Sequence, residues 1–181
     1  MNSRTVQPPA ARRRILLARL LFILSVALLV AAILLVLLAT AEEGAAPATS
    51  FSGLIFIGIV LSNGLVGLLI LQRKPGHPVG WILLTIGLAA ALLTAGGSVA
   101  EAIGADPSSF NRADLAELPS IAQLLLWVGI WIWFPIAILP IVFIPLYFPT
   151  GRLLSRRWRW VAGAAIVALL AGMVSYAIDP V

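Results

Sequence analysis

Long apolar stretches alternate with short polar segments along the whole chain. A helix needs about 20 apolar residues to cross the hydrocarbon core of a bilayer, and each stretch is near or above that length. The stretches cover residues 15–38, 51–71, 81–103, 119–147 and 160–178. We therefore predict an all-α, polytopic integral membrane protein with about five transmembrane helices, in which a basic tail (1–14) precedes a single five-helix membrane domain (15–181).

Composition favours the same class. Hydrophobic residues make up 61% of the 181 positions, charged residues make up 10%, and the mean hydropathy is +1.08. A water-soluble domain of this size carries a much smaller apolar fraction. The chain has no cysteine, which excludes disulfides, thiolate metal sites and cysteine nucleophiles, and its one histidine, His77, is too few for a histidine-rich metal site.

The positive charges gather at alternate ends of the predicted spans. Residues 1–14, 72–80 and 148–159, together with Arg19, hold eleven of the twelve Lys and Arg residues, whereas all seven acids fall on the other side or at its border. Because Lys and Arg concentrate in cytoplasmic loops, we predict that the N-terminus is cytoplasmic and the C-terminus outside. The predicted location is the cell's inner (plasma) membrane.

The same distribution predicts lipid contacts and argues against nucleic acid, because the cations sit at the ends of apolar runs. The loop cations that we expect at anionic headgroups are Arg73, Lys74, Arg152, Arg156, Arg157 and Arg159. Aromatic residues agree with this orientation, since Trp and Tyr prefer the two interfaces. We expect Trp81, Tyr147, Trp158 and Trp160 at the inner interface and Trp127, Trp131 and Trp133 near the outer end of the fourth span.

The first apolar stretch admits a second interpretation. Arg12, Arg13, Arg14 and Arg19 precede it or lie at its start, and Ala39-Thr40-Ala41 has the small-x-small pattern of a signal-peptide cleavage site. The apolar run is about twice as long as a signal-peptide core, so we favour an uncleaved helix; a mature N-terminus at Glu42 would overturn this. Because Pro8-Pro9 opposes a helix, we expect this helix to begin near residue 15.

Small residues mark candidate packing faces within the spans. Lipid supplies no hydrophobic force between helices, so close association needs side chains that let backbones approach. At four-residue spacing the third span offers Gly87, Ala91 and Ala95, and the fifth offers Ala164, Ala168 and Gly172. These stripes are expected to contact other helices of the same chain or of a dimer.

Polar residues within the spans are few. Asn63 lies near the middle of the second span, where an unpaired amide is costly, so we expect it to face another helix and to form a hydrogen bond there. Glu101 lies in the last turn of the third span, too shallow for a proton relay, and we expect it to be solvated or paired with Arg112.

The fourth span contains Pro135, Pro140 and Pro145. Each proline removes a backbone donor and clashes with the carbonyl four residues earlier, so this helix should bend at least once.

Catalytic motifs are absent from the sequence. It has no phosphate-binding Gly-rich loop, no paired midplane carboxylates and no Ser/His/Asp set, so we expect no enzymatic activity and no cofactor in this chain.

Two predicted cytoplasmic loops resemble a known family. Residues 73–84 (RKPGHPVGWILL) resemble the R-(x)-P-x-N/H-P-(I/V)-G-W-L-L stretch that follows an early transmembrane helix in many bacterial membrane proteins. Residues 148–159 (FPTGRLLSRRWR) are similar to the F-P-(D/T)-G-R-L-P-S-x-R-W-R stretch of the same proteins, with Leu154 in place of the common proline. This pair occurs in the N-terminal multi-helix membrane region of bacterial two-component sensor histidine kinases and in related stand-alone membrane proteins.

The resemblance implies a non-enzymatic sensory or regulatory membrane module like the input region of such a kinase. With the C-terminus outside, a cytoplasmic kinase domain could follow only after a further span, so we expect either a truncated input region or a small protein sharing it. An alternative is a structural or assembly partner of another membrane protein. A transporter fragment is less favoured, because Asn63 is the one clear midplane polar group and no inverted repeat is evident.

Overall fold

A computed structural model of the chain describes residues 9–42, 51–102, 120–148, 151–153, 155 and 157–178, and within these ranges the chain is helical apart from turns. The helices are α1 (Pro9–Glu42), α2 (Phe51–Arg73), α3 (Pro78–Ala102), α5 (Ser120–Ile138), the π-helical segment η1 (Leu139–Phe143), α6 (Ile144–Tyr147) and α7 (Trp158–Ile178). Among them are five stretches long and apolar enough to cross a membrane: Pro9–Ala39, Gly53–Arg73, Pro78–Ala100, Gln123–Tyr147 and Trp158–Ser175. The predicted all-helical architecture is confirmed.

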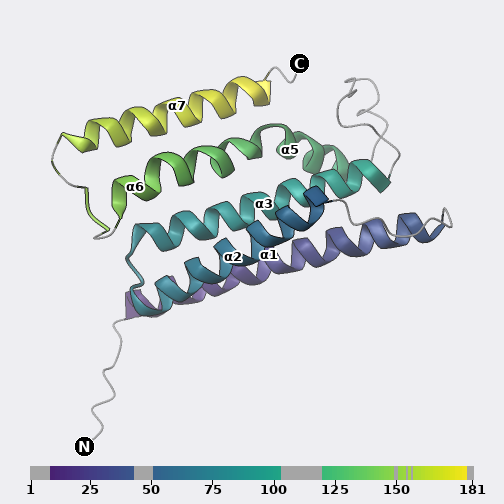
Figure 1. Ribbon diagram of the computed structural model, residues 1–181, viewed down its shortest axis with the longest axis horizontal. Helices are drawn as coiled ribbons and strands as arrows, with labels where there is room; N and C mark the ends of the chain where they lie inside the picture. The colour runs from purple at the N-terminus through teal and green to yellow at the C-terminus, as the bar shows by residue number, and fades with distance from the viewer. Residues whose placement is uncertain are drawn as a thin grey trace, which may run out of the picture.

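Helix α3 lies at the centre of the bundle (Figure 1). Helices α1 and α2 pack against it and against each other, α5 packs against its other side, and α7 packs on α5. Half of the apolar window of α3 is buried within the protein, compared with 6% of that of α7. A residue on α3 therefore meets other helices on most sides, whereas α7 is an edge helix.

Helix α1 begins earlier than predicted, at Pro9 instead of near residue 15. Proline is well tolerated in the first turn of a helix, where its missing N–H has no partner to lose, and arginine is a good helix former. Residues 9–14 of the predicted tail are therefore helical and extend the apolar span by a basic turn.

The interface between α2 and α3 is built on glycine. A Cβ atom built on Gly67 would lie 2.8 Å from the carbonyl oxygen of Gly80, and one built on Gly87 would lie 3.1 Å from the backbone nitrogen of Gly64. Backbone thus approaches backbone at two points along this pair. Such close approach is the geometry that small residues permit between membrane helices.

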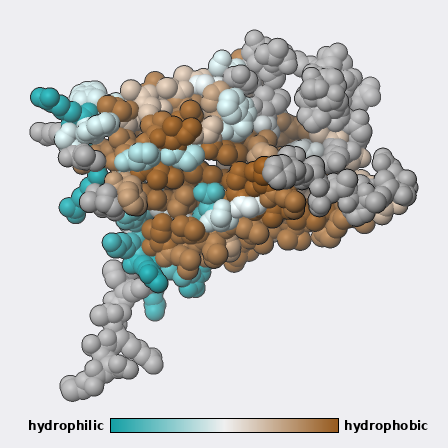
Figure 2. Space-filling view, viewed as in Figure 1, coloured by the Kyte–Doolittle hydropathy of each residue, from teal (hydrophilic) through white to brown (hydrophobic). Residues whose placement is uncertain are grey.

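The outer surface of the bundle is apolar along the helices and hydrophilic at one end (Figure 2). Exposed leucine, isoleucine and valine side chains line α1, α2 and α7. The polar end is the one where α1 begins, α2 ends, α3 begins, α6 ends and α7 begins. We call it the basic end, and a bundle with this apolar exterior is typical of multi-pass membrane proteins.

Candidate functional site

The turn between α2 and α3 is tight and held by backbone hydrogen bonds. Lys74 N–H donates to the Ile70 carbonyl at 2.7 Å, and His77 N–H donates to the Lys74 carbonyl at 3.0 Å. Pro78 then opens α3, as suits a residue whose fixed φ matches the first helical position. The turn predicted at residues 72–80 is present, and His77 is its last residue before α3.

The loop after α6 is shaped by Gly151. Its N–H donates to the Tyr147 carbonyl at 2.7 Å, which satisfies one of the carbonyls left free at the end of α6. Its φ is +72°, a left-handed conformation that glycine adopts without the Cβ clash of other residues. Gly151 therefore reverses the chain directly after the helix and directs it toward α7.

The two loops meet. A Cβ atom built on Gly151 would lie 3.0 Å from both Cδ2 and Nε2 of His77 and 3.2 Å from Cδ of Pro78. The imidazole of one loop thus lies against the bare Cα of the other, where any larger residue would push it away. We call the contact of His77, Pro78 and Gly151 the loop junction.

Neighbouring side chains enclose the loop junction. The indole N–H of Trp81 donates to the Pro75 carbonyl at 3.3 Å, which ties the first turn of α3 to the loop. The Arg14 guanidinium from α1 approaches the same loop, since a Cβ atom on Gly76 would lie 3.3 Å from its terminal nitrogen. A groove of about 590 Å³ opens beside these groups, lined by Arg14, Gly76, Pro78, Trp81, Ile82, Leu139, Phe143, Tyr147, Ile166 and Leu169.

A small apolar core connects the loop junction to the π-helical segment. Phe143 at the end of η1, Leu146 of α6 and Ala162 of α7 are buried together. Leu153 from the loop and Ile82 from α3 pack against this cluster. A displacement of η1 would therefore change the packing of both the loop and the start of α7.

The predicted headgroup cations lie at the basic end. Arg73, Lys74, Arg152, Arg157 and Arg159 are all exposed there, and Arg156 lies outside the described residues. The described ranges contain just two acids, Glu42 and Glu101, each at the far end of its helix. The charges of Arg73, Lys74, Arg157 and Arg159 are thus not neutralised by any carboxylate in the described part of the chain.

The small-residue stripe of α3 faces the interior. Gly87 lies against Gly64 and Val60 of α2, and Ala91 and Ala95 are buried. Successive positions four residues apart rotate by about 40° around a helix, because four residues exceed one 3.6-residue turn. The stripe therefore turns from α2 at Gly87 toward α5, which approaches the backbone at the neighbouring Gly96.

The stripe of α7 is split by the same rotation. Gly172 packs against the ring of Phe134 on α5, whereas Ala164 and Ala168 are exposed. The predicted contact within the chain is thus present at Gly172. For Ala164 and Ala168, which face outward, a contact with a second chain stays a prediction. At the C-terminal end of α7, the indole N–H of Trp127 on α5 donates to the Ala177 carbonyl at 3.1 Å and joins α5 to α7.

Asn63 corrects a second expectation. Its side-chain amide donates to the Ile59 carbonyl at 2.9 Å, within α2 itself, and not to another helix. A short polar side chain on a helix can bond to the carbonyl four residues earlier. Ser25, Ser62, Thr85 and Thr94 form the same kind of bond within their helices.

The predicted kink residues lie along the interrupted fourth helix. Pro135 is inside α5, Pro140 falls in the first turn of η1, and Pro145 falls in the first turn of α6. The Ile144 N–H donates to the Leu139 carbonyl, five residues earlier, as in a π-helix. The proline-rich stretch thus changes its helical hydrogen bonding shortly before the loop junction.

Gly67, Gly80 and Gly151 carry close contacts that sequence reasoning missed. A signal existed for Gly67, because glycine inside a helix costs about 1 kcal/mol relative to alanine and so points to a packing role. The pairing of Gly151 with His77 had no signal in the sequence, since the two residues lie in different loops. The predicted pair of Glu101 and Arg112 lies outside the described side chains.

Within the described ranges no group of three or more His, Cys, Asp or Glu residues comes together to hold a metal ion. Comparisons of the chain with protein-family models, with curated proteins and with solved structures give no match. The resemblance to sensor-kinase membrane regions therefore stays a prediction.

Proposed function

We propose that the chain is a non-enzymatic sensory or regulatory module of the bacterial inner membrane, with five spans, a cytoplasmic N-terminus and the basic end in the cytoplasm. Its output is the relative position of the two loops at the basic end. The observation that carries this proposal is the loop junction, where Gly151 packs on His77 and Pro78 at the end of a proline-interrupted helix.

The interrupted helix supplies the movable part. A π-helical turn is rare in proteins and is often found at functional sites. Residues of α6 alone separate η1 from Phe148, and Phe143 and Leu146 bury their side chains with Ala162 of α7. A change in the packing of α5 is therefore transmitted over a short distance to Gly151, while His77 stays fixed to α2 and α3.

Two further observations support the proposal. The loops that meet at the junction are the two whose sequences resemble those of sensor-kinase membrane regions. The exposed cations Arg73, Lys74, Arg157 and Arg159 lie at the same end of the bundle as the junction, and the described residues at this end include no carboxylate, so anionic headgroups are suited to neutralise them. Changes at the membrane surface or in the bilayer thus act on the loops directly.

Distance measurements between the loops test the sensory role. Gln72 and Ser155 are exposed and uncharged, and the chain has no native cysteine, so a double-cysteine variant can carry two spin labels. In bilayers of increasing thickness and anionic fraction, the proposal predicts two distance populations whose ratio changes, because tilt and packing respond to mismatch. A single distribution that stays the same in every bilayer would contradict a sensory role.

The exposed face of α7 favours a second candidate, an assembly partner of another membrane protein or of a second copy of this chain. Ala164 and Ala168 are exposed, and a Cβ atom on Gly163 would meet nothing within 4 Å. A face of small residues lets another helix approach closely. Ala168→Leu should then abolish a stable complex isolated in mild detergent, whereas a monomer in wild-type preparations would exclude this candidate.

A further inference from the structure

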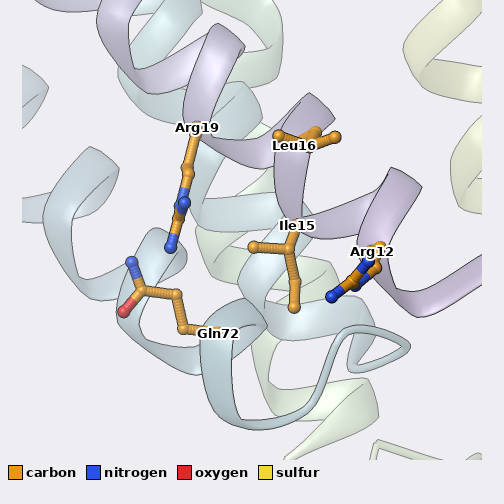
Figure 3. Close-up of a pocket in the computed structure, with 5 residues that line it drawn as sticks. All are labelled: Arg12, Ile15, Leu16, Arg19 and Gln72. Atoms are coloured by element: carbon orange, nitrogen blue, oxygen red, sulfur yellow. The ribbon is translucent and has the colours of Figure 1, made fainter. Parts of the chain in front are cut away.

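A second polar pocket lies at the basic end, between the start of α1 and the end of α2. Its volume is about 450 Å³, and it is lined by Arg12, Ile15, Leu16, Arg19 and Gln72. Figure 3 shows the side chains of Arg19 and Gln72 pointing toward one another, with Ile15 between this pair and Arg12. The loop junction does not include this pocket, since their lining residues differ.

The register of α1 places both arginines on one face. Arg12, Leu16 and Arg19 are spaced by four and three residues, so they lie above one another along the helix. The neighbouring face of this turn is fixed against α2, because Ala18 is completely buried with Leu68 and Leu71. The packing of α1 on α2 therefore places Arg12, Arg19 and Gln72 in the lining of one pocket.

Neither guanidinium has an acidic partner within the described ranges. The acid on α1 is Glu42, which follows Arg19 by more than six helical turns and therefore lies about 35 Å away along the helix. The described part of α2 contains no acid at all. Two arginines gathered in one pocket without a carboxylate call for an anion from outside the chain, and their planar donor groups suit phosphate oxygens.

Apolar surface continues from the pocket along both helices. Leu16 and Leu20 of α1 are exposed, and so are Leu69 and Leu65, which lie one and two turns from Gln72 on α2. A free phosphate ion would contact the arginines alone. A phospholipid would contact the arginines through its phosphate and the exposed leucines through its acyl chains.

We propose that the pocket of Arg12, Arg19 and Gln72 binds one anionic phospholipid of the leaflet that contacts the basic end. The two guanidinium groups and the Gln72 amide donate hydrogen bonds to its phosphate oxygens, and its chains lie over the exposed leucines of α1 and α2. This inference rests on the proposed membrane insertion but not on the sensory role. It assigns a discrete site to arginines of α1, apart from the general contact of the loop cations with headgroups.

Native mass spectrometry of the full chain released from mixed micelles tests the site. The probes are phosphatidylglycerol and phosphatidylcholine with identical chains. The wild-type protein should retain one phosphatidylglycerol preferentially. Arg12→Gln and Arg19→Gln should each weaken its binding about fivefold, and the double variant about 30-fold, as expected for the loss of about 1 kcal/mol per surface cation.

Arg13→Gln is the matched control, because it removes the same charge at the adjacent position of α1, outside the pocket. It should change phosphatidylglycerol binding by less than about twofold, since a cation outside the pocket makes no direct contact with the lipid. Circular dichroism and a monodisperse elution profile show that the variants remain folded.

Three results would overturn the proposal. An equal loss in Arg13→Gln would mean diffuse surface charge, and equal retention of phosphatidylcholine would mean a purely apolar groove. Displacement of the lipid by inorganic phosphate, with sodium chloride of equal ionic strength having no effect, would mean a free-phosphate site. Because the assay is done in micelles, it is independent of orientation, so its failure is distinguishable from an error in the proposed topology.

Discussion

Gly151 sets how closely the two loops of the basic end approach each other. Gly151→Ala would place a methyl group 3.0 Å from the His77 ring and would force a side chain into φ +72°. We expect it to lower the free energy of unfolding by about 1–2 kcal/mol, the usual cost of the left-handed conformation. Unfolding of the detergent-solubilised protein by a denaturing detergent measures this change.

Gly163→Ala is the matched control for that substitution. Its Cβ atom would meet nothing within 4 Å, and Gly163 lies within α7, so alanine should stabilise the helix by about 0.5–1 kcal/mol. Equal effects of the two substitutions would show that Gly151 has no special place in the loop junction.

Gly67 sets the separation of α2 and α3. In Gly67→Ala the new methyl group would lie 2.8 Å from the Gly80 carbonyl oxygen and 2.9 Å from the Leu84 nitrogen, both backbone atoms that cannot rotate away. Overpacking of this kind costs about 1–3 kcal/mol, which unfolding in detergent would detect. Gly58→Ala on the same helix meets nothing within 4 Å and should not destabilise; a loss equal to that of Gly67→Ala would refute the close contact.

At the scale of single residues, the sequence predicted that a side chain forms a hydrogen bond or packs closely more reliably than it predicted which residue it contacts. Asn63 was expected to be satisfied and is, but by the Ile59 carbonyl of its own helix. The cost of leaving an amide unpaired in an apolar environment predicts that Asn63 forms a hydrogen bond. It does not predict whether the acceptor is a carbonyl of the same helix or a group on another helix. The contact of Gly151 with His77 was unpredictable for a related reason, because no periodicity connects two loops.

Among the elements, the π-helical segment η1 depends on its prolines. In Pro140→Ala the new N–H could donate to the Ile136 carbonyl, and the ring that clashes with this carbonyl would be gone. We expect the segment to return to α-helical hydrogen bonding, so that the amide of Ile144, which now bonds five residues back, exchanges its hydrogen more slowly. Hydrogen exchange by NMR in detergent measures this rate.

Pro135→Ala is the control, because Pro135 lies inside α5, before the π-helical segment begins. It should leave exchange at Ile144 unchanged. Faster exchange at Ile144 in Pro140→Ala would contradict the assignment of the irregular turn to that proline.

Helix bounds followed closely from apolarity, with instructive exceptions. The predicted spans 51–71 and 160–178 match α2 and α7 to within two residues, whereas α1 extends to Pro9 because arginines can continue a helix that apolarity no longer marks. Four-residue spacing selected the buried face of α3 correctly, since neighbours surround that helix. On α7 the same spacing marks a face that is covered by Phe134 at Gly172 and exposed at Ala164, where a contact with a second chain stays a prediction.

For the whole molecule, the order of the helices in space did not follow from sequence. Apolar periodicity does not tell which span packs against which. The central place of α3 depends on close approach at glycines: Gly67 of α2 lies against α3, Gly87 of α3 lies against α2, and Gly96 of α3 lies against α5. The gathering of Arg12, Arg19, Arg73 and Arg157 at one end did follow, because spans of alternating direction bring alternate loops together.

The orientation of this basic end is the central claim, and cysteine accessibility tests it most directly. The chain has no cysteine, so single cysteines at the exposed, uncharged positions Gln72, Ser155, Ala41 and Ser120 report their own location. In intact cells a membrane-impermeant maleimide should label Ala41→Cys and Ser120→Cys, and should reach Gln72→Cys and Ser155→Cys only after the membrane is permeabilised. Labelling of Gln72→Cys and Ser155→Cys in intact cells, or on opposite sides of the membrane, would contradict the account.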